Sequence, residues 1–535
     1  MLLATVMPIL LHLLIIMPLA GAGLILLLPS SAVQTIKRIA QLICLLLALC
    51  SATIFLAVNN KSTTQYGDLL LAEKYSWISL DMGNWGKLKV MYFLGIDGLN
   101  LPLVLLSGIV LLLGALASYH IKKLHKAYFS LYLLLAATVM GSFLALDFFL
   151  FFLFFEFMLL PMYFLIGIWG GERREYAAIK FFIYTFFGSA MILVAMIALC
   201  LSVQDQTGSQ SFDLLLMTQP EAYTPDSLLD VHGKSFLWGF PARTVVFILL
   251  LIGFGIKIPV VPLHTWLPDA HVEAPTPISI VLAGILLKIG GYGLMRIAFP
   301  LFPAEMQKMT WWIALLGAGS ILYGSIVALG QNNLKKMIAY SSVSHMGYVT
   351  LGLASLNTKG AAGAMMQMFS HGLLSAMLFA VAGVIYQRTH DMEIDHYKGL
   401  TQAMPYYATF TGIAFFASLG LPGFSAFVAE LLVLLGSFSS ELIPLWMPLL
   451  ALIALLIGAG YFLWTFQRMF MGELSLQQAQ WRPRLYDLTP TEWMLLLLPA
   501  VLSLAIGILP TWLLEGIENS LLHWLLLWKK LQLVN

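Results

Sequence analysis

The stretch Gly253–Gly293, GFGIKIPVVPLHTWLPDAHVEAPTPISIVLAGILLKIGGYG, decides how the rest of the chain is interpreted. Apolar sequence long enough to lie in a bilayer flanks it, yet the stretch itself contains five prolines. Its titratable side chains are Lys257, His264, Asp269, His271, Glu273 and Lys288. In hydrocarbon each charge is costly, and each proline frees a backbone carbonyl that needs another partner. Because a purely structural span gains nothing from either feature, the stretch indicates a working site inside a membrane.

The composition of the 535 residues is that of an integral membrane protein, with 60% hydrophobic and only 10% charged residues. A soluble domain carries about 25% charged residues. The net charge of +2 argues against a nucleic-acid partner. The three cysteines lie in apolar runs without ligand spacing, which indicates packing rather than a disulfide or a metal site. No iron–sulfur, haem, dinucleotide or P-loop signature is present, so no redox centre or cofactor is expected in this chain.

The hydropathy pattern predicts an all-α membrane protein with about fourteen transmembrane helices. The N-terminal apolar stretch has no basic region before it and is expected to be a retained first span rather than a signal peptide. Ile517–Leu531, with Trp524 and Trp528 beside Lys529 and Lys530, is expected to be an interfacial tail. The spans are expected near residues 5–28, 36–58, 97–119, 127–147, 148–170, 178–202, 243–268, 274–299, 309–330, 334–356, 360–387, 405–436, 445–470 and 490–514.

Lysine and arginine are concentrated in the loops that follow the odd-numbered spans. By the positive-inside rule these loops face the cytoplasm, so both termini are expected on the opposite, periplasmic side. The long segments Asn59–Ile96 and Ser202–Pro241 then fold over the outer surface. No separate soluble domain is expected.

Charges near the middle of the spans are the main functional signal. A lysine reaches only ~6 Å, whereas the midplane lies ~15 Å from either interface, so snorkelling does not explain them. Four such charges cost about 10–14 kcal/mol even on the lenient insertion scale. This cost predicts a proton-transfer role for Glu156, Lys257, Lys288 and Glu430. The candidates for further positions on the proton path are His264, His345 and His371.

Prolines close to two of these charges predict broken helices. Pro259 and Pro262 follow Lys257, and Pro422 precedes Glu430. Broken helices in corresponding halves point to a transport site in a carrier built from repeats, and an offset of five spans suits two five-helix repeats. A metal site in HTWLPDAH is not expected, because its spacing matches no zinc motif and a proline interrupts it.

Four motifs together resemble a known family. These are FFEFMLLPMYFLIGIWG, GIKIPVVPLHTWLPDAHVEAPTPISIVLAGILLKIGGYGLMR, LKKMIAYSSVSHMGYV and LPGFSAFVAELLVL. They are similar to the antiporter-like proton-pumping subunits of respiratory complex I, NADH:quinone oxidoreductase, whose superfamily includes the multisubunit cation/proton antiporters. The resemblance covers the chain from about Asp97 to the end of the thirteenth span.

The resemblance implies a fourteen-helix fold with two inverted five-helix repeats and broken helices seven and twelve. It divides the chain into residues 1–126, a first repeat at 127–299, a second at 300–470, and a last span with its tail at 471–535. It implies a place in a bacterial inner membrane beside other membrane-arm subunits, especially the sister subunits L and N, which carry lysine at the position of Glu430. FMN, iron–sulfur clusters and quinone are then expected in partner subunits.

The resulting hypothesis is that Glu156 sets the proton affinity of Lys257 and that Lys288 passes protons through the histidines to Glu430. Redox energy would arrive from partner subunits along the polar row. Two alternatives stay open at this point. One is a subunit of a multisubunit Na+/H+ antiporter, which would share nearly every motif. The other is a scaffold subunit that does not pump, against which the number of costly charges counts.

Overall fold

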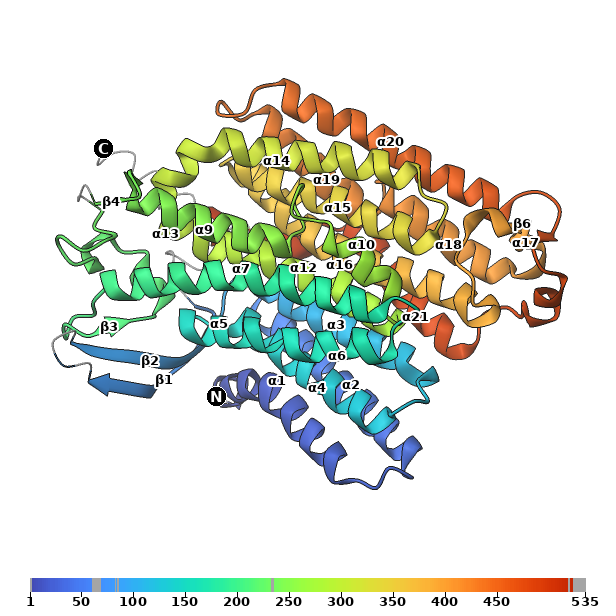
Figure 1. Cartoon of the computed structure of the whole chain (residues 1–535), viewed down its shortest axis with the longest axis horizontal. Coiled ribbons are helices and arrows are strands. Elements are labelled where there is room, and N and C mark those ends of the chain that lie inside the picture. The colour runs from blue at the N-terminus through green and yellow to red at the C-terminus, as the bar shows by residue number, and fades with distance from the viewer. Residues whose placement is uncertain are drawn as a thin grey trace.

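The computed structural model describes residues 2–59, 69–81, 83, 86–231, 235–517 and 520–522. Within these ranges, eleven helical segments are long and apolar enough to cross a membrane, and they form one bundle (Figure 1). Uninterrupted α-helices form α1 (Leu2–Leu27), α2 (Val33–Val58), α4 (His125–Leu144), α7 (Arg174–Ser202), α14 (Pro303–Leu329), α16 (Thr358–Thr389), α20 (Trp446–Phe470) and α21 (Pro490–Ile508). The other spanning segments are α3 (Leu101–Ala117) with a short 3-10 turn, the pair α5 (Phe148–Phe157) and α6 (Leu159–Trp169), and the run Thr276–Leu301.

The run Thr276–Leu301 and α16 are the most buried of these segments. The run is not a regular helix. It comprises α11 (Thr276–Val281), a π-helical turn η4 (Leu282–Leu286), α12 (Leu287–Gly293), a second π-helical turn η5 (Leu294–Ala298) and α13 (Phe299–Leu301). π-turns widen a helix locally and occur often at functional sites. Lys288 therefore lies directly after a widened turn in the centre of the bundle.

Two membrane helices are interrupted, and both interruptions fall where the prolines predict them. The first helix consists of α9 (Ala242–Lys257) and α10 (Trp266–Glu273), and the second of α18 (Pro405–Ser418) and α19 (Ser425–Phe438). The first break frees backbone carbonyls from their helical hydrogen bonds. One of them, the carbonyl of Ile256, accepts a hydrogen bond from Trp266 Nε1 at 2.9 Å. A further long helix, α15 (Leu334–Ala354), packs against α14 and α16. The count of fourteen spans, the inverted repeats and the four-part division stay predictions.

The two long segments expected at the outer surface form a small sheet and loops at one end of the bundle (Figure 1). Strands β1 (Leu71–Asp81) and β2 (Lys87–Ile96) pair antiparallel, and β3 (Gln210–Ser211) pairs parallel with β2. Ion pairs tie the segments together: Lys74 lies 2.6 Å from Asp213, and Lys89 lies 2.8 Å from Asp205. The remaining short elements are α8 (Leu214–Met217), β4 (Phe236–Leu237), β5 (Phe240–Pro241), β6 (Tyr397–Lys398), α17 (Leu400–Ala403), β7 (Ser475–Leu476) and the 3-10 turns η3 (Pro220–Ala222), η6 (Ile394–His396) and η7 (Ala479–Arg484).

The described residues of the expected tail are Ile517 and residues 520–522. Trp524, Trp528, Lys529 and Lys530 lie outside the described residues.

A buried ion pair fastens the ends of two spans. Arg388, at the end of α16, donates to both carboxylate oxygens of Glu492 in the first turn of α21, at 2.8 and 2.9 Å. It also donates to the carbonyl of Tyr486. Thr489 and Glu492 form a capping box that starts α21. Because each charge of this pair has its partner within hydrogen-bond distance, the pair is a structural clamp rather than a transfer site.

Candidate functional site

Four of the predicted side chains lie in one buried row across the centre of the bundle. The row begins at Lys288 on α12, whose Nζ is 2.7 Å from Nδ1 of His371 on α16. Lys288 also donates to the carbonyl of Ala283 in the π-turn η4. Lys288 is fully buried, and these two groups are its hydrogen-bond partners within the described residues. Its ammonium is thus held directly against an imidazole nitrogen that can accept a proton.

The row continues from His371 to His345 on α15. Their ring centroids are 5.5 Å apart. Nδ1 of His345 lies 3.1 Å from the Gln367 amide nitrogen and 3.4 Å from Oε1 of Glu430 on α19. A ring nitrogen holds at most one proton, so this nitrogen accepts from Gln367 when it is bare and donates to Glu430 when it is protonated. His345 therefore has two alternative partners, one for each protonation state.

The broken helix α18/α19 brings Glu430 into the row. Gly420 lies in the break with a φ of +81°, in the left-handed region that favours glycine. A Cβ at this position would lie 2.5 Å from Oε2 of Glu430. The interruption lets the backbone approach the carboxylate more closely than a side chain would permit.

A small cavity separates the two histidine rings from the α18/α19 break. Its volume is about 10 Å³, and its lining includes His345, Gln367, His371 and Ser418. Each of these residues contributes one buried polar atom that has no protein partner: Nε2 of both histidines, Oε1 of Gln367 and Oγ of Ser418. A cavity needs roughly 10–15 Å³ and two to four polar partners to hold a water molecule. This cavity meets both requirements.

Lys257 is the last residue of α9 and points into a different environment. The side chain is buried, and its Nζ has no hydrogen-bond acceptor among the described residues. The Nζ lies 4.8 Å from the centroid of the Phe155 ring and 5.8 Å from that of Phe181. Both the aromatic faces and the negative end of α9 favour a cation here.

Glu156, next to Phe155 on α5, is the carboxylate that acts electrostatically on Lys257. The ion pairs among the described residues extend to 3.7 Å, and Glu156 with Lys257 is not one of them. Oε2 of Glu156 is also buried without a hydrogen-bond partner. Glu156 and Lys257 therefore form no direct salt bridge, and their partnership in proton transfer stays a prediction.

The remaining candidate, His264, lies away from the row. Its ring packs edge-on against Tyr323, with centroids 5.0 Å apart, and also lies near Tyr340. Within the described residues, no hydrogen bond or ion pair connects Lys257 with Lys288, or His264 with either lysine. The structure therefore brings four of the seven candidates into one row and leaves three outside it.

Sequence analysis missed two polar residues of this region. Gln367 and Ser418 are uncharged residues in apolar spans, and only the tertiary contacts reveal them. His271, one of the titratable side chains of the stretch Gly253–Gly293, is fully buried and stacked on Phe379, with ring centroids 4.5 Å apart. Both its ring nitrogens lack partners in the part of the chain that the structure describes. α10, which carries His271, packs against α15 inside the bundle.

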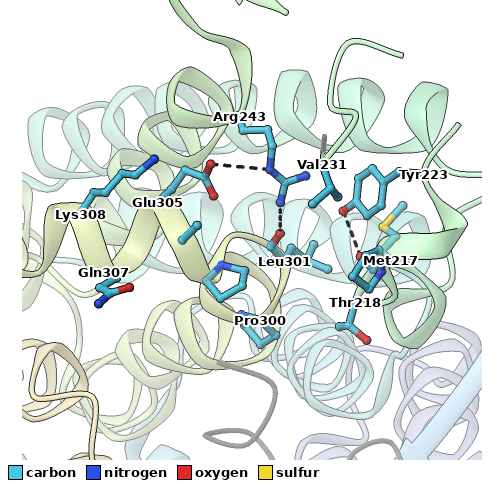
Figure 2. Close-up of a pocket in the computed structure, with 13 residues that line it drawn as sticks. Met217, Thr218, Tyr223, Val231, Arg243, Pro300, Leu301, Glu305, Gln307 and Lys308 are labelled. Atoms are coloured by element: carbon cyan, nitrogen blue, oxygen red, sulfur yellow. Dashed lines mark hydrogen bonds and ion pairs between the residues drawn. The ribbon is translucent and has the colours of Figure 1, made fainter. Parts of the chain in front are cut away.

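A larger cavity of about 390 Å³ lies at the N-terminal ends of α9 and α14, away from the row (Figure 2). Arg243 donates to the carbonyls of Leu229 and Leu301, at 2.9 and 2.8 Å, and lies 3.6 Å from Glu305. Its guanidinium also lies over the Tyr223 ring. These contacts tie the segment before α9 to the helices that follow, so we interpret the group as a structural latch.

Comparison with known proteins identifies the family of the chain. The family model described as NADH:quinone oxidoreductase/Mrp antiporter, TM, matches residues 145–458. A relative from Rhodobacter capsulatus, NADH-quinone oxidoreductase subunit M, is 42% identical over 81% of this chain and 81% of its own.

Solved structures match over almost the whole chain. In the structure of respiratory complex I from Thermus thermophilus with bound NADH, a chain of 28% identity matches with a TM-score of 0.78, covering 97% of this chain and 99% of that one. A chain of the Mrp complex from Dietzia sp., 19% identical, matches in fold with a TM-score of 0.77, covering 96% and 97%. The chain therefore belongs to the NADH:quinone oxidoreductase/Mrp antiporter transmembrane family.

Proposed function

We propose that this chain is a proton-translocating membrane-arm subunit of an NADH:quinone oxidoreductase. The observation that carries the proposal is the row Lys288–His371–His345–Glu430, in which every member can bind and release a proton. A buried row of this kind is expensive in a membrane and is typical of proton relays. The 42% identity to a subunit M supports the complex in which the row would act.

The contacts suggest how a proton would move along the row. Lys288 gives a proton from Nζ to Nδ1 of His371, and His371 releases one from Nε2 into the cavity. A water molecule held by the four unpartnered polar atoms passes a proton to Nε2 of His345. His345 then releases a proton from Nδ1 to Glu430. Each histidine thus receives on one ring nitrogen and gives from the other.

Lys257 and Glu156 would act as a second, separate loading pair. A free lysine has a pKa near ~10.4, and each unit of change requires ~1.4 kcal/mol of altered interaction. Because Lys257 and Glu156 interact without touching, a modest movement or a protonation of Glu156 changes that interaction. Such a change alters the proton affinity of Lys257, so that the lysine binds or releases a proton. His271 and His264 would lie on the approach to these sites rather than in the row.

The proposal includes the position of this chain in the complex and its orientation in the membrane. The glutamate at position 430 and the similarity to a subunit M support a position between sister subunits L and N. The basic loops would face the cytoplasm of a bacterium, with both termini on the periplasmic side of the inner membrane. FMN, iron–sulfur clusters and quinone would be bound by partner subunits, and their redox energy would reach this chain through the polar row.

The competing function is that of a cation/proton antiporter subunit, because the fold is also similar to that of a chain of the Mrp complex. The test is to purify the chain with its natural neighbours and to measure NADH oxidation together with proton uptake in sealed vesicles. Co-purification of iron–sulfur subunits and NADH-driven proton movement support the proposal. Sodium-driven proton movement, from an assembly without such subunits, would favour the antiporter.

A further inference from the structure

A groove of about 620 Å³ runs along the outside of the bundle between α18 and α20. One wall is a face of α18 that includes Pro405, Gly412 and Phe416, and the other contains Phe466 and Phe470 of α20. The groove is lined mainly by apolar groups, and Gly412 deepens it because glycine has no side chain there. It shares no residue with the proton-transfer row.

The length of the groove fits one leaflet of a membrane. From Pro405 to Phe416 the helix rises by about 16 Å, since each residue adds 1.5 Å. Half of a hydrocarbon core of ~30 Å is ~15 Å. The groove stops where α18 ends at Ser418, beside the break that leads to Glu430. A neighbouring transmembrane helix would need a groove of twice this length, whereas one acyl chain fits.

The other end of the groove is polar and lies against a basic loop. Thr401 and Gln402 line it, and both are exposed. They are held by hydrogen bonds to the carbonyls of Phe470 and Gly472, at 2.7 and 3.2 Å. Lys398 lies directly over Gly472, because a Cβ built there would be 2.9 Å from Cε and 3.7 Å from Nζ of that lysine.

The exposed charges of this region that have no ion-pair partner are mainly positive. They are Lys398, Arg482 and Arg484, against Glu473 beside Gly472. Two further carboxylates are engaged, since Asp395 pairs with Arg468 and Asp487 accepts from the N–H groups of Tyr406 and Tyr407. Basic pockets between transmembrane helices bind the head groups of anionic lipids, and each lysine or arginine near the surface contributes ~1 kcal/mol. The length of the groove, its apolar lining and the charge at its polar end therefore all fit an anionic lipid.

We propose that the α18–α20 groove binds one acyl chain of an anionic phospholipid, with its phosphate at Lys398 and its tail at Phe416. The tail then packs beside the break of the second interrupted helix, because the Leu421 N–H donates to the Phe416 carbonyl at 3.2 Å. The same break loop contains Gly420, which lies against Glu430. The bound lipid thus supports the loop that positions one end of the proton-transfer row.

The tail site is tested with a photoactivatable phosphatidylglycerol that carries a diazirine in its acyl chain. The intact complex is reconstituted into vesicles with this lipid, irradiated and mapped by mass spectrometry. We expect labelling of peptides from α18 and α20. Gly412→Phe fills the groove and removes this labelling. Gly412→Ala retains it, because a Cβ at Gly412 meets only ordinary contacts, the nearest being Phe466 at 3.5 Å.

Unchanged labelling in assembled Gly412→Phe complexes overturns the proposal. So does a photoreactive residue at Thr409 that crosslinks to a helix of another subunit instead of to lipid. The head-group site is tested by competition between phosphatidylglycerol and phosphatidylcholine vesicles. Lys398→Gln is expected to reduce the preference for phosphatidylglycerol about fivefold, the equivalent of ~1 kcal/mol. The control Lys123→Gln, which removes an exposed lysine from another loop, is expected to leave the preference unchanged. An unchanged preference in Lys398→Gln overturns the assignment of the phosphate to Lys398.

Discussion

The imidazole of His345 lies 3.4 Å from the carboxylate of Glu430, while the Gln367 amide competes for the same ring nitrogen. These residues come from three helices, and the break before α19 is what admits Glu430 to the group. Because His345 has one partner for each protonation state of this nitrogen, it can both accept a proton and pass it to Glu430 at the end of the row.

Replacement of Glu430 tests this end of the row. Glu430→Gln is expected to reduce proton pumping by about 10²-fold, since an amide cannot take and release a proton. Glu430→Lys is expected to retain partial function, because a lysine can still carry one. The measurement is pumping and quinone reductase activity at matched levels of assembled complex. A glutamine variant that outperforms the lysine variant would show that Glu430 is not a proton carrier.

The long-range pair of Glu156 and Lys257 predicts a graded response. Glu156→Gln removes the charge and keeps the shape, so pumping should fall severely. Glu156→Asp keeps the charge with a shorter side chain and should retain part of the activity. Because no direct salt bridge exists to be broken, both variants should assemble normally. Equal activity of Glu156→Gln and the parent would leave Glu156 as a packing residue.

Ser418 tests the cavity beside the histidines. Ser418→Ala removes one of the four polar atoms that would hold a water molecule and leaves the helix end in place. Pumping is expected to slow severalfold, with a larger slowing in deuterated water than in the parent. Ser437→Ala on α19 is the matched control, since its hydroxyl bonds the Val433 carbonyl of its own helix. If both variants behave alike, the cavity has no part in proton transfer.

The Arg388–Glu492 clamp predicts an effect on stability rather than on transfer. Glu492→Gln leaves Arg388 buried without its counter-charge, a change that costs about 3–5 kcal/mol. Thermal denaturation of the complex and the yield of assembled protein should both fall. The double variant Arg388→Met with Glu492→Gln should recover part of the loss, because no unpaired charge remains. If Glu492→Gln alone is as stable as the parent, the Arg388–Glu492 pair does not stabilise the bundle.

The sequence was sufficient to predict the fold class and the positions of both broken helices. Prolines and charges inside apolar runs carry strong physical costs, and such costs can be read without a structure. The sequence could not predict that Lys288 pairs with His371, or that Glu156 and Lys257 stay apart, because both depend on how separate helices pack. Gln367 and Ser418 were missed for the same reason, since a neutral polar residue in a span costs little and gives no signal.

The central claim is that protons pass through the row from Lys288 to Glu430, and His371 is the residue that links its two halves. The most direct measurement is NADH-driven acidification of vesicles containing His371→Ala, compared with Met377→Leu, a volume-conserving change on the same helix outside the row. The account predicts that His371→Ala abolishes proton movement through this subunit in fully assembled complexes and that Met377→Leu retains it. Normal proton movement in assembled His371→Ala would contradict the account.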